Sequence, residues 1–353
     1  MTRLLVLGGS DFVGRAVVDD ALARGWDVTV LNRGSTPVPD GVRQLVGDRT
    51  RADGLDALRA PGAHDAWDAV VDTWSWAPAA VRDAARLLAD RIPDDGRYVY
   101  VSSRSVYPFP PARGADESAA LVDGDPDDTT HDDYARAKRG AEIAAVEALG
   151  DRAILLRAGL ILGPRENVGR LPWWLRRVVR GGPVLAPGPA DLPLQYVDAR
   201  DLAAFALDVS TNPARASGPV DVVSAPGHTT MGGLLAACVA VTADDAAAAG
   251  NPPAELVWVE PEVVLAAGIE PWSQLPVWLP PGELHDALHG SDTSLAYELG
   301  LRPRDVRETV RDTWTWLRAL DAAGEATPQR ADRPAVGLPP DLEAAALAAA
   351  ATG

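Results

Sequence analysis

The sequence predicts an α/β protein in which a doubly wound parallel sheet is followed by a smaller C-terminal region. Short β-branched segments alternate with helical segments through the first third of the 353 residues. Strands and helices that alternate at this spacing form βαβ units, and such units build parallel sheets. A glycine-rich turn after the first apolar segment is the second observation, and a change to Pro-, Gly- and Trp-rich texture beyond Gly163 is the third.

The elements of the large domain follow from apolar periodicity. We expect strands at residues 4–7, 27–31, 43–46, 69–72, 98–102 and 153–156. We expect helices at residues 13–24, 79–89 and 134–149. Residues 1–163 would form this domain, and residues 196–210 would return to it with a helix at 198–209.

The rest of the chain is expected to divide into two parts. Residues 164–320 would form mainly a substrate-binding region that ends in an amphipathic helix at 306–320. Residues 321–353 are rich in Ala and Pro, and we expect a peripheral tail with a last short helix near 341–347.

Composition argues against several classes of function. A formal net charge of −17 opposes nucleic acid and anionic membranes as partners. The single cysteine, Cys238, excludes an intrachain disulfide, and no cluster of His, Cys and carboxylates has metal-ligand spacing. No signal peptide and no apolar stretch of membrane-spanning length is evident, so we expect a cytoplasmic protein that acts on a small molecule without a metal.

The turn after the first strand has the pattern of a dinucleotide-binding loop. It reads Gly8-Gly9-Ser10-Asp11-Phe12-Val13-Gly14 and opens a helix. Small residues allow backbone amides to approach a pyrophosphate, and the helix N-terminus adds favourable partial charge. The order strand, glycine turn and helix therefore predicts a Rossmann-type cofactor site, with these seven residues as contacts.

The end of the second strand bears on the choice of cofactor. An acid there binds the ribose 2′-hydroxyl of NAD, whereas an Arg accommodates the 2′-phosphate of NADP. This chain has Asn32-Arg33 and no acid, which favours NADP(H) while leaving NAD(H) open. Asp48 either bonds the adenine or caps a turn. The remaining candidate cofactor contacts are Arg49, Asp72, Thr73, Ser102, Ala158, Gly159 and Leu160.

Three residues form a candidate catalytic group. Ser103 ends a predicted strand, and Tyr134 and Lys138 lie four apart on the long predicted helix, so they share one face. An ammonium beside a phenol favours the phenolate, which lets the phenol exchange a proton with an alcohol or carbonyl while hydride moves. A serine hydroxyl can orient the same substrate oxygen.

With these motifs the chain resembles the extended or atypical short-chain dehydrogenase/reductase superfamily, in its NAD-dependent epimerase/dehydratase branch. The resemblance runs to about residue 320 and also covers the segments 101–107, 157–164 and 195–203. It implies that Ser103 is the catalytic serine, that Tyr134 is the acid/base and that Lys138 binds the nicotinamide ribose. A homodimer is a further implication of the resemblance. The chain is also similar to a less characterised subgroup related to chloroplast RNA-binding proteins.

Departures from the family pattern carry information about the ligands. Asp11 replaces the middle glycine of the loop, so its carboxylate must point away from a pyrophosphate or weaken the cofactor's binding. Leu194 and Leu160 stand where nucleotide-sugar enzymes of the family have an Arg and an Asn. Both replacements argue against a UDP- or dTDP-sugar substrate.

Aromatic residues suggest walls for a substrate. Trp74 and Trp76 follow the fourth strand, at the sheet edge where ligands bind, and Trp173 lies in the second region. We predict an NAD(P)-dependent oxidoreductase that transfers hydride at a secondary alcohol or ketone of a small or sugar-like substrate. A sugar epimerase or dehydratase with tightly bound NAD is the alternative. A non-catalytic protein that senses dinucleotide or binds RNA is the alternative of another class.

Overall fold

The computed structural model describes residues 1–60, 66–212 and 216–351. Seven parallel strands form the central sheet in the order β11-β6-β5-β4-β1-β2-β3. Their bounds are β1 Arg3–Leu7, β2 Asp27–Asn32, β3 Arg43–Val46, β4 Ala69–Asp72, β5 Arg97–Ser103, β6 Ala153–Ala158 and β11 Gly218–Val222. The predicted fold class, a doubly wound parallel sheet, is confirmed.

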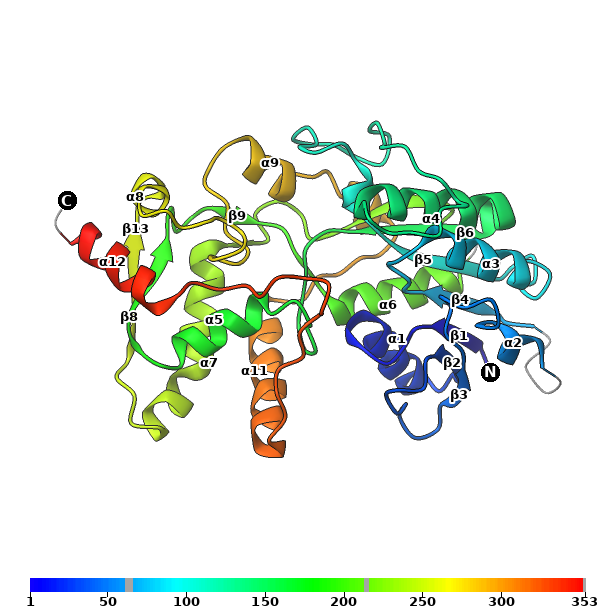
Figure 1. The fold of residues 1–353 in the computed structure, drawn as a ribbon, viewed down its shortest axis with the longest axis horizontal. Helices are drawn as coiled ribbons and strands as arrows, with labels where there is room; N and C mark the ends of the chain where they lie inside the picture. Colours follow the sequence, from blue (N-terminus) through cyan, green and yellow to red (C-terminus); the bar gives the residue numbers. More distant parts are fainter. Residues whose placement is uncertain (61–65, 213–215, 352–353) are drawn as a thin grey trace.

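Helices cover both faces of this sheet (Figure 1). On one face α1 (Phe12–Ala23) packs against α6 (Ala199–Ser210), and on the other α3 (Pro78–Leu88) packs against α4 (Tyr134–Leu149). The short α2 (Asp56–Arg59) lies near β3. Because both faces are covered, the central strands are apolar without interruption, as in the fully buried run Leu4–Leu7.

The strand order reverses beside β1, and this reversal positions the site. The strand β1 pairs with β2 on one side and with β4 on the other. Crossovers leave in opposite directions at such a point, so a crevice opens at the carboxyl ends of the strands. The glycine-rich loop follows β1 directly and therefore lies at this crevice.

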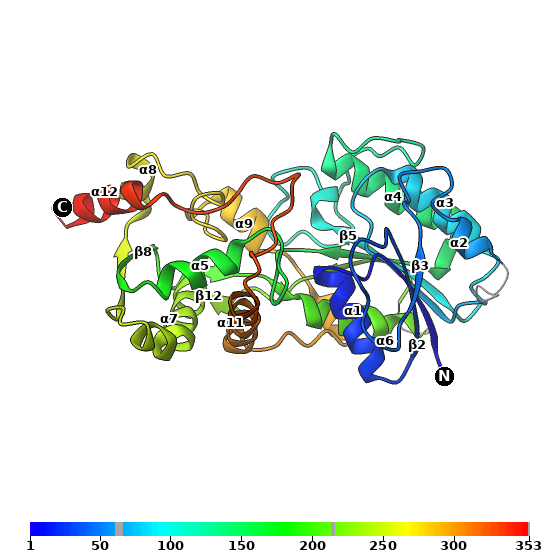
Figure 2. The same ribbon diagram turned by 60° about the horizontal axis from the view of Figure 1, so that its bottom comes forward.

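A second lobe carries its own apolar core, centred on the fully buried Trp174 and Trp278. Its helices are α5 Arg170–Val178, α7 Met231–Ala248, α8 Pro261–Ala266, α9 Glu283–His289, α11 Val306–Ala323 and α12 Pro340–Ala350. Its short strands are β8 Gly182–Pro187, β9 Pro193–Leu194, β12 Thr229–Thr230 and β13 Ala254–Val259. The strands β7 (Ile161–Leu162) and β10 (Val197–Asp198) pair where the chain passes between the lobes. Figure 2 shows the two lobes side by side, with the sheet in one and α5, α7 and α11 in the other.

The apolar helix α7 belongs to the core of this lobe. By length and composition it is the one helix among the described residues that is apolar enough to cross a membrane, with a mean hydropathy of 1.4. It packs against α5 and α11, and 39% of it is buried inside the protein. Cys238 is fully buried on it, and burial raises the pKa of its thiol to about 12, which leaves the thiol unreactive.

The structure corrects the expected division of the chain in two places. Residues 218–222, which the sequence places in the second region, form β11, and this strand pairs with β6 at the edge of the main sheet. The helix α10 (Ser294–Glu298) also packs on β11, and Ala296 is buried in the core of the main domain. Short segments within Pro- and Gly-rich sequence have too little periodicity to be placed from the sequence.

The tail is not peripheral. The helix α12 packs against α8 and β8 of the second lobe, and Ala346 is fully buried there. The Glu343 carboxylate accepts hydrogen bonds of 2.9 and 2.6 Å from Arg177 Nε, and both side chains are nearly buried. An Ala-rich composition predicts the helix but cannot show that one face of it finds an apolar surface and an ion-pair partner.

Candidate active site

The glycine-rich loop has the close-packed geometry that a backbone cradle requires. Gly8 and Gly9 have φ angles of 125° and 83°, a region that side chains rarely adopt. A Cβ on Gly8 would lie 2.2 Å from Thr73 Oγ1, and one on Gly14 would lie 2.6 Å from Gly9 N. The loop therefore needs its glycines to sit between β4 and the start of α1. These features fit a dinucleotide pyrophosphate, which would contact the loop's backbone amides at the helix N-terminus.

Asp11 caps the helix that follows this loop. Its Oδ1 accepts a hydrogen bond of 2.9 Å from the amide of Phe12, and its Oδ2 accepts one of 2.5 Å from Asn167 Nδ2 in the second lobe. Phe12 has a φ of 36°, which is costly for a residue other than glycine. The departure from the family pattern at Asp11 thus creates a hydrogen bond between the two lobes at the mouth of the cofactor loop.

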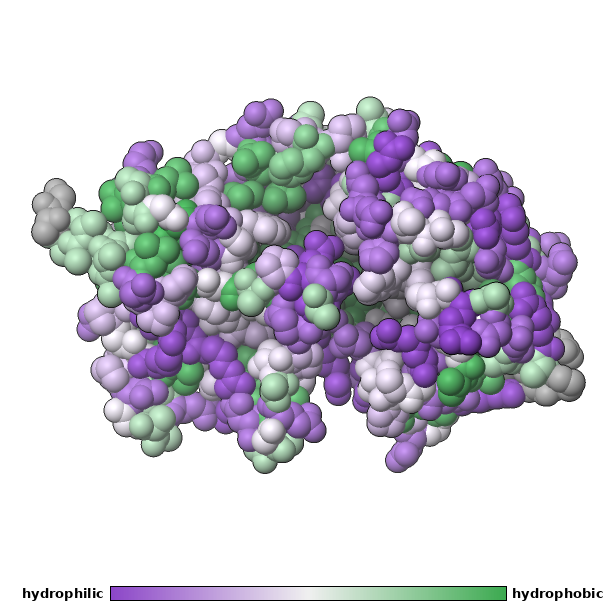
Figure 3. Space-filling view, viewed as in Figure 1, coloured by the Kyte–Doolittle hydropathy of each residue, from purple (hydrophilic) through white to green (hydrophobic). Residues whose placement is uncertain are grey.

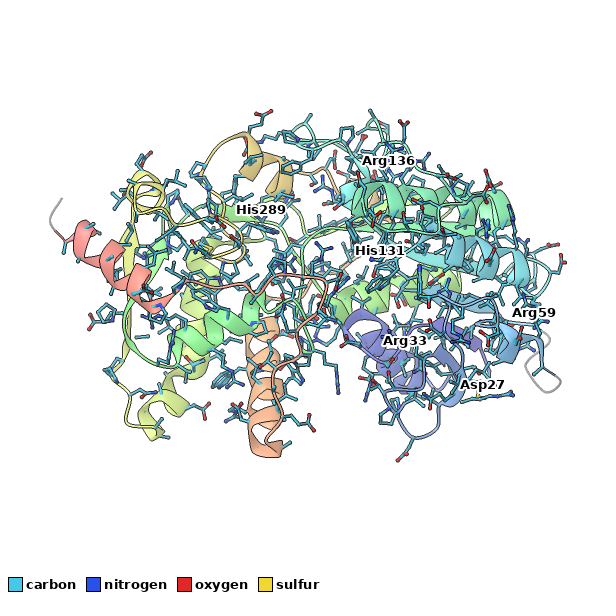
Figure 4. The ribbon with its side chains drawn as sticks, viewed as in Figure 1. Asp27, Arg33, Arg59, His131, Arg136 and His289 are labelled. Atoms are coloured by element: carbon cyan, nitrogen blue, oxygen red, sulfur yellow. The ribbon has the colours of Figure 1, made fainter. Side chains whose placement is uncertain are left out.

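The second strand ends as the sequence predicts, with an amide and an exposed arginine. Asn32 Oδ1 accepts hydrogen bonds from Gly34 N and Gln44 Nε2, and Asn32 Nδ2 donates to Ser10 Oγ at 3.3 Å. Arg33 is exposed at the edge of the main domain (Figure 4). Hydrogen bonds from Thr50 lower the pKa of Asp48, and the charge of Arg33 lowers it further. Asp48 therefore caps the turn at Thr50, and its carboxylate acts on Arg33.

Arg49 and Asp72, two of the candidate cofactor contacts, are instead paired with each other. The Arg49 guanidinium donates two hydrogen bonds, of 2.7 and 2.8 Å, to the Asp72 carboxylate, and both side chains are buried. Asp72 also accepts from the hydroxyl of Tyr98 and from the amide of Trp74. Because both side chains are committed to a buried ion pair beneath the sheet edge, neither is free to contact a cofactor as the sequence suggests.

The catalytic candidates lie on two elements that pack together. Ser103 is the last residue of β5, Tyr134 is the first residue of α4, and Lys138 follows one turn later. The Ser103 hydroxyl accepts the amide hydrogen of Ser105 and contacts its hydroxyl, both at 3.1 Å. Asp133 caps α4 by accepting from Arg136 N at 3.0 Å. The cap begins the helix at Tyr134, and α4 packs against β5.

Lys138 is held more tightly than the sequence suggests. Its Nζ donates to the carbonyl oxygens of Trp74 and Val101 at 2.7 and 2.8 Å, and it lies 4.6 Å from the centre of the Tyr100 ring. Burial lowers its pKa to about 7, against the charge of Asp72, which raises it. In its charged form, which predominates below pH 7, the amine has three donors, so one N–H remains for a ribose hydroxyl.

The remaining candidate cofactor contacts, at the ends of β5 and β6, make contacts within the protein. The Ser102 hydroxyl donates to the buried Glu142 at 2.7 Å, and Glu142 also receives two hydrogen bonds from Arg157. Ser102 therefore belongs to a buried polar network and does not face the crevice. Ala158, Gly159 and Leu160 follow β6, and a Cβ on Gly159 would lie 2.8 Å from a methyl group of Val223. Thr73 and Gly159 thus lie at close approaches of the chain to itself, and their contact with a cofactor stays a prediction.

The three candidate tryptophans have different surroundings. Trp74 Nε1 donates to Ala77 O, and its ring packs 4.9 Å from the Arg49 guanidinium. Trp76 is 37% exposed and makes an edge contact with His131. Trp173 packs against Trp174, and a Cβ on Gly337 would lie 2.1 Å from its Nε1. The C-terminal chain therefore covers Trp173, while Trp76 remains an exposed aromatic wall.

Sequence reasoning missed a buried cluster behind Ser103 and two arginines in front of Tyr134. Asp221 accepts a hydrogen bond of 2.7 Å from the Tyr107 hydroxyl and forms an ion pair with Arg104, and burial raises its pKa to about 6. The two arginines, Arg330 and Arg333, come from the tail. Figure 3 shows the surface hollowed between the lobes, where the tail passes. No motif links residues so far apart in the chain.

The sequence matches a known protein family and a curated relative. The sequence model of the NAD dependent epimerase/dehydratase family matches residues 4–223, which is more than half of the chain. The chain belongs to this family. It is 26% identical over 271 residues to the chloroplast stem-loop binding protein of 41 kDa b of Arabidopsis thaliana. That match covers 74% of this chain and 66%, just under two thirds, of the relative.

Solved structures show the same fold at low identity. The enzyme WbmH of Bordetella bronchiseptica, in complex with NAD⁺, is 17% identical with a TM-score of 0.64, over 90% of this chain and 99% of that one. The UDP-glucose 4-epimerase of Thermus thermophilus, in complex with NAD, is 21% identical with a TM-score of 0.59, over 90% of this chain and 99% of that one. The expected preference for NADP(H) finds no support in these complexes, both of which hold NAD.

Proposed function

We propose that this protein is an NAD-dependent enzyme that transfers hydride at a secondary alcohol or ketone. The observation that carries the proposal is that Tyr134 and Lys138 lie one turn apart on α4, with Lys138 Nζ hydrogen-bonded to Val101 O of β5 and to Trp74 O beyond β4. The family and the NAD complexes of its structural relatives support the cofactor.

Each residue has a chemical role in this proposal. Bound NAD would supply the hydride acceptor or donor, and the loop at residues 8–14 would hold its pyrophosphate. Tyr134 exchanges a proton with the substrate hydroxyl. The hydroxyl of Tyr134 is free to do so, because it makes no hydrogen bond to any other described residue. Ser103 orients the substrate oxygen, and the remaining N–H of Lys138 positions the ribose.

Reduction and epimerisation begin with the same hydride step, so the site supports both. In the first case the cofactor exchanges with solution during turnover, and in the second it stays bound and shows no net redox change. Leu194 and Leu160 replace the Arg and Asn with which the nucleotide-sugar enzymes of the family hold their substrate. These replacements argue against a nucleotide sugar bound in the same way.

The test begins with the identity of the nucleotide. Purified protein is denatured and the released ligand is identified by mass spectrometry, and calorimetry then measures the affinity for NAD⁺ and NADH. The proposal expects NAD or measurable NAD binding that a Gly14→Val variant loses, because its side chain would collide with Gly9 N. Arg307→Ala, at an exposed position on α11 remote from the loop, is the control. Absence of NAD binding in correctly folded wild type would contradict the proposal.

RNA binding is the second candidate, because the Arabidopsis relative is named for binding stem-loops. The charge of −17 opposes it, since a phosphate backbone would be repelled. A gel-shift titration against a stem-loop RNA at two salt concentrations distinguishes the two. Salt-sensitive RNA binding without NAD binding would favour this candidate.

A further inference from the structure

The segment between α11 and α12, residues 325–339, crosses from one lobe to the other and back, and we call it the C-terminal strap. Arg330 N donates to Asn167 O at 2.9 Å, and Gly337 N donates to Ser273 O at 2.8 Å. Figure 1 and Figure 2 both show the red strap turning between α1 and α5 before it reaches α12. Asn167 also bonds Asp11, so the turn of the strap lies beside the cofactor loop.

The C-terminal end of the strap is anchored. Leu338 is buried in the core of the second lobe, and Gly337 packs closely on Trp173. The ion pair of Glu343 with Arg177 fixes the helix that follows. The turn at residues 330–333 is therefore held by the structure that follows it and by the hydrogen bond of Arg330 N to Asn167 O.

Arg333 reaches the catalytic tyrosine from this turn. Its guanidinium carbon lies 5.0 Å from the centre of the Tyr134 ring, and the side chain is 40% exposed. Within the described part of the chain its guanidinium donates no hydrogen bond, and the closest carboxylate, that of Asp332, is 4.0 Å away. A guanidinium carries five donors in a planar fork, so most of its hydrogen-bonding capacity is available beside Tyr134.

Two more arginines approach the same place. Arg330 forms two hydrogen bonds, of 2.9 and 2.6 Å, with Asp332, and the charges of Tyr134 and Asp11 act on its pKa. Arg170 begins α5 and lies 3.7 Å from the buried Glu166, with Trp272 beside it. Burial lowers the pKa of Arg170, and the charges of Arg333 and Arg330 lower it further. The carboxylates Glu166 and Asp332 thus only partly offset three neighbouring cations.

We propose that the C-terminal strap completes the active site by supplying Arg333, supported by Arg330 and Arg170, to bind an anionic group of the substrate beside Tyr134. The anionic group is a carboxylate or a phosphate, whose paired oxygens match the guanidinium fork. This inference rests on the proposed function, because it names the chemistry of the substrate that Tyr134 acts on.

The electrostatics of the whole chain make this local arrangement informative. With a net charge of −17 the protein repels anions at long range. An anionic substrate therefore depends on short-range contacts with fixed cations. Arg333 provides these contacts at the turn of the strap.

The test is calorimetric titration of the full-length, NAD-saturated protein with two probes, malonate and inorganic phosphate. Saturation with NAD keeps the probes from the pyrophosphate position. We expect at least one probe to bind, and its identity distinguishes a carboxylate from a phosphate. Arg333→Ala should weaken that binding by roughly tenfold or more, because it removes one partner of a charged pair.

Two further variants make the result specific. Arg333→Lys keeps the charge but loses the fork, so its affinity for the probe should fall between those of wild type and Arg333→Ala. Arg307→Ala, at an exposed position on α11, is the matched control and should bind like wild type. NAD affinity, measured in the same samples, should be unchanged in all three variants, which a merely structural role of Arg333 would not predict.

The outcomes separate this inference from the proposed function. Wild type that binds NAD but neither probe, or Arg333→Ala that binds the probe as tightly as wild type, overturns the anion site and leaves the proposed function intact. Wild type that binds a probe through Arg333 but binds no NAD supports the anion site and overturns the proposed function.

Discussion

Lys138 Nζ donates a hydrogen bond of 2.7 Å to the carbonyl oxygen of Trp74, although the two residues are 64 positions apart in the chain. Trp74 lies just beyond the end of β4, and Lys138 lies on α4. A second bond from the same amine, to Val101 O, connects it to β5. The lysine is therefore positioned by the backbone of two neighbouring strand ends, at the place where the cofactor ribose is proposed to bind.

This burial predicts an unusual pH dependence of stability. Burial lowers the pKa of Lys138 from 10.5, the value of an exposed lysine as in the unfolded chain, to about 7 in the folded protein. Between these values the unfolded chain binds a proton that the folded chain does not, so raising the pH stabilises the fold, by up to about 1.4 kcal/mol per pH unit. Below pH 7 both states are protonated and the contribution is constant.

Lys138→Met removes this titration. In the variant the carbonyl oxygens of Trp74 and Val101 lose their hydrogen-bond donor, which lowers the unfolding free energy by an amount that does not vary with pH. Denaturant unfolding of both proteins at pH 7, 8 and 9 should show the stability of wild type minus that of the variant growing as the pH rises. A stability difference that stays constant, or shrinks as the pH rises, would show that folding does not lower the pKa of Lys138.

The acid/base role of Tyr134 predicts a separation of binding from turnover. Tyr134→Phe removes only the hydroxyl, which makes no hydrogen bond to another described residue, so folding and NAD affinity should stay near those of wild type. Turnover, followed as NADH absorbance against a panel of secondary alcohols and ketones, should fall by about 10²- to 10⁴-fold. Undiminished turnover would remove Tyr134 from the mechanism.

Arg33 offers a direct test of cofactor preference. It is exposed after β2, where a 2′-phosphate would lie, but Asp48 is near enough to act on it. If the chain uses NADP(H), Arg33→Ala should weaken NADPH by roughly tenfold and leave NADH unchanged. Equal and small effects on both cofactors, measured by calorimetry, are expected if NAD(H) is the cofactor, as we propose. Arg307→Ala, at an exposed position on α11, is the control.

The docking of α12 predicts that the tail contributes to stability. Glu343→Ala leaves the Arg177 guanidinium buried without its carboxylate, which should cost about 3 kcal/mol of unfolding free energy. Asp341→Ala, at an exposed position in the first turn of the same helix, should change stability by less than about 0.5 kcal/mol. Equal effects of the two variants in chemical denaturation would mean that α12 does not dock in solution.

Much of the sheet could be predicted because its strands are buried on both faces and their apolar runs are continuous, as in β1 and β5. The spacing of the proposed catalytic pair could also be predicted, because Tyr134 and Lys138 are one helical turn apart on a single helix. The partners of Arg49 and Ser102 could not be predicted, because a buried ion pair and a cofactor contact use the same residue types. The position of Arg333 depends on where a long tail returns, and no local pattern encodes that.

The most direct test of the proposed function is a crystal structure of the protein with NAD. It should show the pyrophosphate against the amides of residues 8–14, a ribose hydroxyl hydrogen-bonded to Lys138 Nζ, and the nicotinamide facing the Tyr134 hydroxyl. A dinucleotide bound elsewhere, or a nicotinamide turned away from Tyr134, would contradict the central claim.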